Sequence, residues 1–116
     1  MRGDEERVVT AYAGWLQRNG WTVTRETGFA DVYAERGPEK LYAEAKGRTT
    51  SAGLDVDTLY GQLLRRMQDP ATGARYAVVV PTAALQAALR VPSWVRERLH
   101  IDIYEVDDAG AIHPRG

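Results

Sequence analysis

The stretch FADVYAERGPEKLYAEAKG, residues 29–47, decides the fold. It contains two runs in which apolar and polar residues alternate, 29–35 and 40–47, and the residues between them, 36–39, are a turn signal with adjacent Gly and Pro. Alternation with a period of two is typical of strands that bury one face. The stretch therefore predicts a β-hairpin that turns about its Gly-Pro pair.

The position of the turn predicts the register of the hairpin. It puts six apolar residues on one face: Ala30, Val32, Ala34, Leu41, Ala43 and Ala45. The other face then carries three opposed pairs: Phe29 with Lys46, Asp31 with Glu44, and Tyr33 with Tyr42. A slip of one residue would move the charged side chains onto the buried face, so the alternation supports this register.

The opposed pair of carboxylates is the feature that suggests chemistry. Side chains that face each other across a hairpin have Cβ atoms about 5 Å apart, so Asp31 and Glu44 would repel each other. Lys46 lies two residues along the strand, about 7 Å away, and cannot neutralise both acids by itself. A Mg²⁺ ion, usually held by one or two carboxylates and by water, would offset both charges. The alternative is an ordinary solvated strand face with a cross-strand Glu–Lys pair.

The segments around the hairpin predict a layered α/β fold. Strands are expected at 21–25, 29–35, 40–47 and 76–80, with the final strand at 101–106. Helices are expected over 4–19, from Asp57 to a stop near Asp69-Pro70, over the Ala-rich segment 82–90, and from Ser93. Three antiparallel strands followed by a crossover helix to a buried strand form a mixed β-sheet flanked by helices on both faces.

Length and composition limit the classes of protein to consider. The chain, residues 1–116, is the size of one domain. The net charge of −1 does not indicate a nucleic-acid-binding protein, and the absence of Cys excludes disulfides and thiolate zinc sites. The charged N-terminus has no apolar signal region behind it, and the longest apolar run is far shorter than a membrane span. We therefore expect a cytoplasmic protein without membrane association.

The hairpin resembles the PD-(D/E)XK nuclease superfamily, whose members have the restriction-endonuclease-like fold. In that pattern an Asp opens one strand of a hairpin and Glu-X-Lys lies on the next, and Asp31, Glu44 and Lys46 match these positions. Ala30 stands where the name of the superfamily has Pro, a minor departure. The predicted order of elements over residues 4–80 is similar to the αβββαβ core of this superfamily. Within it, the chain is most similar to archaeal Holliday-junction resolvases and small restriction-like domains.

The resemblance implies a Mg²⁺-dependent nuclease that hydrolyses phosphodiester bonds in DNA, with Mn²⁺ as a substitute metal. Asp31, Glu44 and the main-chain carbonyl of Ala45 would bind the metal, and Lys46 would orient or deprotonate the attacking water. The second hypothesis is a catalytically inactive module of the same fold that binds nucleic acid or a protein partner. It is favoured by the mildly acidic net charge. The third is an unrelated α/β domain with a chance match.

Four further residues are candidates for accessory roles. The superfamily often has a Gln or a basic residue on the helix after the motif, and Gln62 and Arg66 lie four apart on one flank of that helix; a solvated flank is the alternative. Arg48 could contact phosphates, although an ordinary loop residue is the favoured interpretation. Glu5 is the candidate for a Glu that the superfamily often has on its first helix. A first-turn carboxylate that stabilises the helix dipole is the favoured interpretation of Glu5.

The small size of the chain also suggests self-association. A single domain covers little duplex, and nucleases that cut both strands often act as two-fold dimers. The Ala-rich segment 82–90 and the region around Trp94 are the candidate surfaces for a homodimer.

Overall fold

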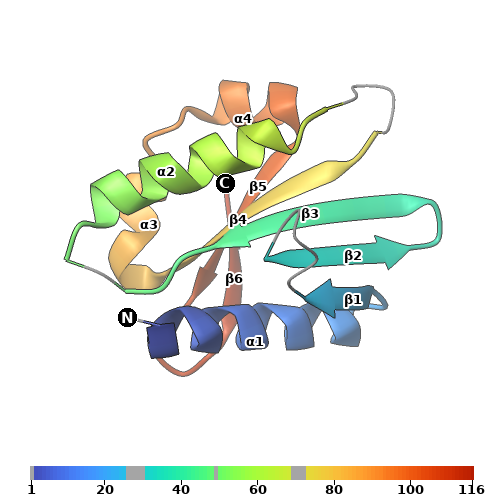
Figure 1. Ribbon diagram of the computed structural model, residues 1–116, viewed down its shortest axis with the longest axis horizontal. Coiled ribbons are helices and arrows are strands. Elements are labelled where there is room, and N and C mark those ends of the chain that lie inside the picture. The colour runs from blue at the N-terminus through green and yellow to red at the C-terminus, as the bar shows by residue number, and fades with distance from the viewer. Residues whose placement is uncertain (1, 26–30, 49, 69–72) are drawn as a thin grey trace.

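The computed structural model describes residues 2–25, 31–48, 50–68 and 73–116 of the chain. These residues form one sheet of six strands in the order β1-β2-β3-β4-β5-β6 (Figure 1). The strands are β1 (Thr22–Arg25), β2 (Val32–Arg36), β3 (Glu39–Ala45), β4 (Arg75–Pro81), β5 (Ile101–Val106) and β6 (Ile112–Arg115). The helices are α1 (Arg2–Arg18), α2 (Ala52–Arg65), the 3₁₀ turn η2 (Thr82–Ala84), α3 (Leu85–Ala88) and α4 (Ser93–Leu99). None of the helices in these ranges has the length and apolar character that crossing a bilayer requires.

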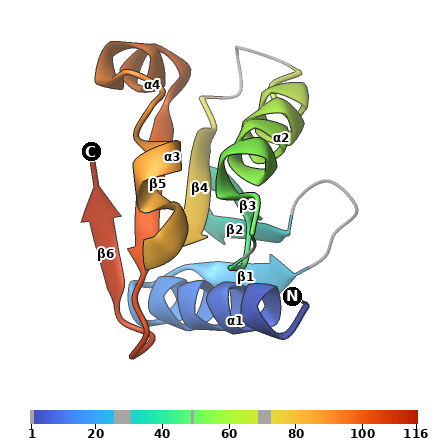
Figure 2. The same ribbon diagram turned by 90° about the vertical axis from the view of Figure 1, so that its left-hand side faces the viewer.

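The sheet is mixed, as the order of the elements predicts. Strands β1, β2 and β3 are antiparallel neighbours, whereas β3, β4 and β5 are parallel. Parallel neighbours need a long crossover, and α2 supplies the one between β3 and β4. Helix α1 covers one face of the sheet, and α2, α3 and α4 lie on the other (Figures 1 and 2). The expected α/β fold with helices on both faces is confirmed.

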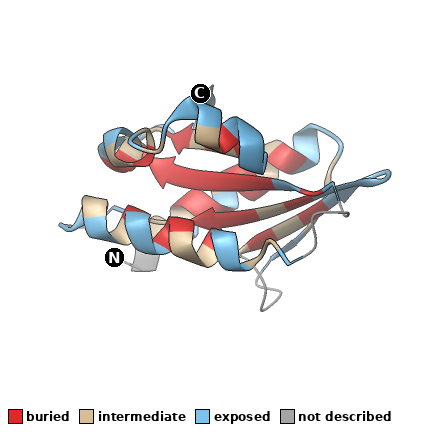
Figure 3. Cartoon of the chain, turned by 90° about the horizontal axis from the view of Figure 1, so that it is seen from above, coloured by how far each residue is buried: buried red, intermediate tan, exposed pale blue. Residues whose placement is uncertain are grey.

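Two apolar cores separate the sheet from its helices. The core under α1 contains Val8, Val9, Tyr12, Leu16, Val32, Ala34, Leu41, Ala43 and Ala45. Strand β4 contributes to both cores, because Ala77 and Val79 join the core under α1 while Val78 and Val80 join the core under α2. Figure 3 shows the buried residues on the strands and on the inward faces of the helices. The uninterrupted apolar run of β4 is thus explained by burial on both faces, as expected.

The register of the hairpin is confirmed. Val32 is paired with Ala43, and Tyr33 is paired with Tyr42. Strand β2 begins directly after Asp31, and β3 ends directly before Lys46. The expected partners Phe29 and Ala30 lie outside the described residues. The register is specified because its apolar face must meet α1, where Ala43 and Ala45 are small enough for close packing.

Several element boundaries differ from the sequence predictions. Helix α2 begins at Ala52, so Asp57 lies inside the helix and does not cap it. Its buried stripe includes Val56, which lies before the expected start, and tertiary packing of this stripe outweighs the weak helix propensity of the first turn. Helix α2 ends at Arg65, before the expected stop. The Ala-rich segment 82–90 forms η2 and the single turn α3 instead of one helix.

The prediction that 101–106 is the final strand is wrong, because β6 follows it and pairs antiparallel with β5. Strand β6 is four residues long and includes Pro114, which can be accommodated on an edge strand but not in the middle of a sheet. Its end is held by an ion pair between Arg115 and the buried Glu105, 2.7 Å apart. The two residues lie ten positions apart in the sequence, and no local pattern indicates that they pair.

Candidate active site

The two acids of the hairpin meet beside the end of β3. The main-chain N–H of Ala45 donates a hydrogen bond of 2.8 Å to Oδ2 of Asp31, which holds that carboxylate across from Glu44. Glu44 is only 4% exposed because α2 lies over this face of the sheet. Burial, the charge of Asp31 and a hydrogen bond between the two carboxyls raise the pKa of Glu44 to about 7, although Arg66 opposes the shift. The interpretation of this face as a solvated strand surface is therefore wrong for Glu44.

Arg66 follows the last residue of α2 and is the counter-charge of the buried acid. Its Nε and Nη2 both lie 3.3 Å from Oε1 of Glu44. Gln62 lies one turn earlier on α2 and is half-buried. Within the described ranges, no hydrogen bond joins Gln62 to either acid. Of the two residues expected on this helix, the structure brings Arg66 to the acid pair.

Gly47 allows close packing between the first turn of α1 and the segment that follows β3. A Cβ atom on Gly47 would lie 2.4 Å from the main-chain nitrogen of Glu5, so only Gly allows α1 to pack this closely against the residue after Lys46. Burial and the charge of Asp31 raise the pKa of the Glu5 carboxyl, and Lys46 lowers it. Glu5 lies in the first turn of α1 and interacts electrostatically with Asp31 and Lys46.

Lys46 continues the alignment of β3 with β4. Its main-chain N–H donates a hydrogen bond of 3.1 Å to the carbonyl of Val79, and its side chain is half-buried. Asp31 and Glu44 therefore meet in the hairpin, and Glu5, in the first turn of α1, interacts electrostatically with Asp31 and Lys46. The sequence contains one signal for this approach of α1, namely Gly47. A Gly near the end of a strand can indicate that another backbone comes close.

The donor atoms of this cluster fit a small, hard divalent cation. Within the described ranges, no three or more His, Cys, Asp and Glu side chains are close enough together to hold a metal ion. Mg²⁺ needs fewer protein ligands, since it is usually bound by one or two carboxylates and keeps several waters. Asp31 and Glu44 meet this requirement, and a buried carboxyl with a raised pKa next to a second acid is an environment that a cation would stabilise.

The raised pKa of Glu44 should make the stability of the metal-free protein depend on pH, which can be measured in EDTA. Because the pKa rises from an ordinary value near 4.5 to about 7 on folding, the native protein binds more protons than the unfolded chain between these values. Stability is therefore lost as the pH rises through this window. Glu44→Gln removes the charge, and we expect it to stabilise the metal-free protein at about pH 8 by an amount on the order of 1–3 kcal/mol.

The matched control is Glu105→Gln. Hydrogen bonds from Thr82 and Arg115 lower the pKa of the buried Glu105 carboxyl, so its charged form stabilises the fold at neutral pH and above. Thermal unfolding should therefore show opposite changes for the two substitutions at the same pH. A lower melting temperature for Glu44→Gln at high pH would contradict the assignment of Glu44 as a carboxyl whose pKa is raised by folding.

These features define the class of the protein: a restriction-endonuclease-like α/β fold with a mixed sheet, carrying an acid pair beside the end of its third strand. No protein-family model matches the sequence, and no curated protein matches it. Among solved structures, the chain is similar to an XisH family protein from Nostoc punctiforme PCC 73102, with a TM-score of 0.63 and 19% sequence identity. The match covers 92% of this chain and 96% of the other. At this identity the likeness shows the fold alone.

Proposed function

We propose that this protein is a Mg²⁺-dependent nuclease that hydrolyses phosphodiester bonds in DNA. The observation that carries the proposal is the meeting of Asp31 with the buried Glu44, with Lys46 directly after the strand that holds Glu44. Two acids and a Lys in this order also match the pattern of the PD-(D/E)XK nucleases. The restriction-endonuclease-like fold supports the proposal, and the same fold also serves proteins without catalytic activity.

The residues of the site would divide the work as follows. Asp31, Glu44 and the main-chain carbonyl of Ala45 would hold the metal, and Mn²⁺, which also prefers oxygen ligands, would replace Mg²⁺. The bound metal would lower the pKa of a water and offset negative charge on the phosphoryl oxygens. Lys46 would orient the attacking water or accept its proton, and its ammonium group would stabilise the phosphate in the transition state.

The basic residues around the site would contact the substrate. Arg66 offsets the charge of Glu44 in the structure. When a metal ion offsets this charge instead, the planar guanidinium of Arg66 would be available for bidentate binding of a phosphate. Gln62 is proposed to contact the substrate from the same helix flank, and Arg48 from the loop after Lys46. Glu5 would be an accessory acid that faces the metal site. A DNA partner and a homodimer both stay predictions.

Cleavage assays test the proposed function directly. The protein would be incubated with supercoiled plasmid, linear duplex and single-stranded DNA in Mg²⁺, in Mn²⁺ and in EDTA, and the products separated on gels. We expect cleavage of at least one DNA form in either metal and none in EDTA. Cleavage of equal extent in EDTA would point to a contaminating activity and would remove support for the proposal.

The second candidate is a non-catalytic module that binds nucleic acid or a protein. The contact that favours it is the ion pair between Arg66 and Glu44, which already offsets the buried charge without a metal. DNA binding that weakens with salt, together with the absence of turnover in Mg²⁺ and Mn²⁺, would favour this candidate.

A further inference from the structure

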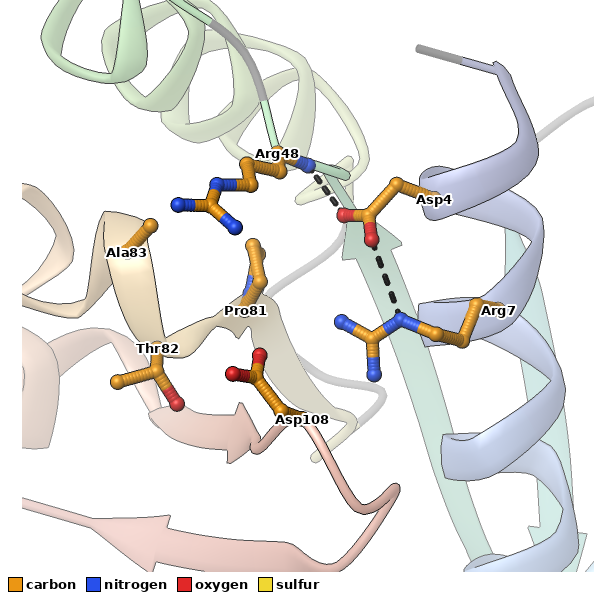
Figure 4. A pocket seen from close by; sticks show the side chains of 7 residues that line it. All are labelled: Asp4, Arg7, Arg48, Pro81, Thr82, Ala83 and Asp108. Atoms are coloured by element: carbon orange, nitrogen blue, oxygen red, sulfur yellow. Dashed lines mark hydrogen bonds and ion pairs between the residues drawn. The ribbon is translucent and has the colours of Figure 1, made fainter.

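A pocket of about 450 Å³ is lined by Arg48, which is proposed above to contact the substrate, and by residues that the proposed mechanism does not use. It forms where the first turn of α1, the loop after β3 and the ends of β4 and β5 meet (Figure 4). Its lining residues are Asp4, Arg7, Arg48, Pro81, Thr82, Ala83 and Asp108. Sequence reasoning identified Arg48 alone among these residues, because the others come from segments far apart in the chain.

Hydrogen bonds to Asp4 hold the guanidinium group of Arg7 and the main chain of Arg48 in place. Arg7 donates to Oδ1 of Asp4 at 3.1 Å and to the main-chain carbonyl of Asp107 at 2.9 Å. The other oxygen of Asp4 accepts a hydrogen bond from the main-chain N–H of Arg48. Asp4 therefore ties α1 to the loop after β3. Figure 4 shows the guanidinium groups of Arg7 and Arg48 on opposite sides of the pocket, with Pro81 and the carboxylate of Asp108 between them.

The wall opposite α1 is also fixed. The hydroxyl of Thr82 donates a hydrogen bond of 2.5 Å to Oε2 of Glu105, and Arg115 donates one of 2.8 Å to Oε1 of the same carboxylate. Pro81 and Ala83 flank Thr82 and offer an apolar surface. The pocket therefore combines two guanidinium groups with apolar wall residues, and its volume lies in the range of about 300–1,000 Å³ that is typical of small-molecule sites.

We propose that this pocket binds one nucleotide of the substrate strand, next to the phosphodiester that the acid cluster cleaves. Arg48 and Arg7 would bind the phosphate of this nucleotide, because guanidinium groups are suited to phosphate oxygens. Pro81 and Ala83 would contact its sugar or base. The volume exceeds what a phosphate group alone would fill, which favours a whole nucleotide over a free phosphate ion.

Two residues of the pocket lie close in the sequence to residues of the candidate active site. Arg48 lies two residues after Lys46, and Asp4 directly precedes Glu5. The two segments that carry Lys46 and Glu5 therefore also contribute Arg48 and Asp4 to the pocket. This placement rests on the proposed nuclease function, whereas the binding of a nucleotide can be measured without cleavage.

The test measures binding of a short fluorescein-labelled single-stranded DNA by anisotropy, in EDTA and over a series of salt concentrations. We expect Arg48→Ala to weaken binding several-fold and to reduce the magnitude of the salt slope by about 0.7, the value for one lost phosphate contact to a single strand. Asp108→Asn should tighten binding, because it removes a negative charge beside the bound phosphate. The matched control Arg98→Ala removes a charge on α4, at the opposite end of β5, and should change neither quantity.

A competition experiment separates a nucleotide from a free phosphate as the occupant. Deoxyadenosine monophosphate should displace the labelled DNA at a lower concentration than inorganic phosphate does, and Arg48→Ala should weaken competition by both compounds. Equal effects of Arg48→Ala and Arg98→Ala, weaker binding by Asp108→Asn, or equal competition by the two compounds would overturn the proposal. An Arg48 effect without any metal-dependent cleavage would support the pocket and count against the nuclease, and cleavage without an Arg48 effect would do the reverse.

Discussion

Lys46→Ala is expected to slow Mg²⁺-dependent DNA cleavage by about 10²–10⁴-fold, the usual contribution of a positioned acid–base group. Lys46 directly follows β3, two residues from Glu44, and its half-buried side chain is part of the same charge cluster as Asp31 and Glu5. Removing the ammonium group would leave the attacking water without its partner and the phosphate with less compensation for its charge.

The chain contains a matched control for this substitution, since Lys40 is its only other Lys. Lys40 lies within β3 and is exposed, so Lys40→Ala should leave the cleavage rate unchanged. The rise in melting temperature on adding Mg²⁺ separates chemistry from metal binding. Lys46→Ala should keep this rise, whereas Asp31→Asn should lose it together with activity. Full activity of Lys46→Ala would exclude Lys46 from the reaction.

Gly47→Ala is expected to destabilise the protein by about 1–3 kcal/mol or more and to reduce cleavage at the same time. The added Cβ would lie 2.4 Å from the nitrogen and 2.8 Å from the Cα of Glu5, both of them main-chain atoms of α1 that cannot rotate away. Helix α1 would have to move off the end of β3. Because the same contact brings Glu5 to Asp31 and Lys46, stability and activity should fall together.

Gly61→Ala is the control for Gly47→Ala. Gly61 lies inside α2, and a Cβ there would meet nothing within 4 Å. Ala should therefore stabilise the helix by about 0.5–1 kcal/mol, since Gly is a poor helix former. Thermal unfolding of both variants is the measurement. A melting temperature of Gly47→Ala equal to that of the unaltered protein would contradict the close packing of α1 on β3.

The hairpin and its acid pair could be predicted because their pattern is local. Alternation along the strands and a Gly-Pro turn specify which residues oppose each other, and a slip would bury charge. The register of Val32 with Ala43 and the approach of Asp31 to Glu44 follow from this. Strand β4 could also be predicted from a local pattern, because a short uninterrupted run of apolar residues is typical of a strand that is buried on both faces.

Contacts between distant segments could not be predicted in this way. Periodicity assigns Glu44 to the polar face of the hairpin, but only the position of α2 over that face makes it buried and pairs it with Arg66. Glu5 joins the acids because α1 packs on Gly47, and Asp4, Arg7, Thr82 and Asp108 share a pocket only after the sheet has formed. The side-chain chemistry was thus encoded in short runs of residues, whereas burial, pKa and the pocket arose from packing between elements that no short run can specify.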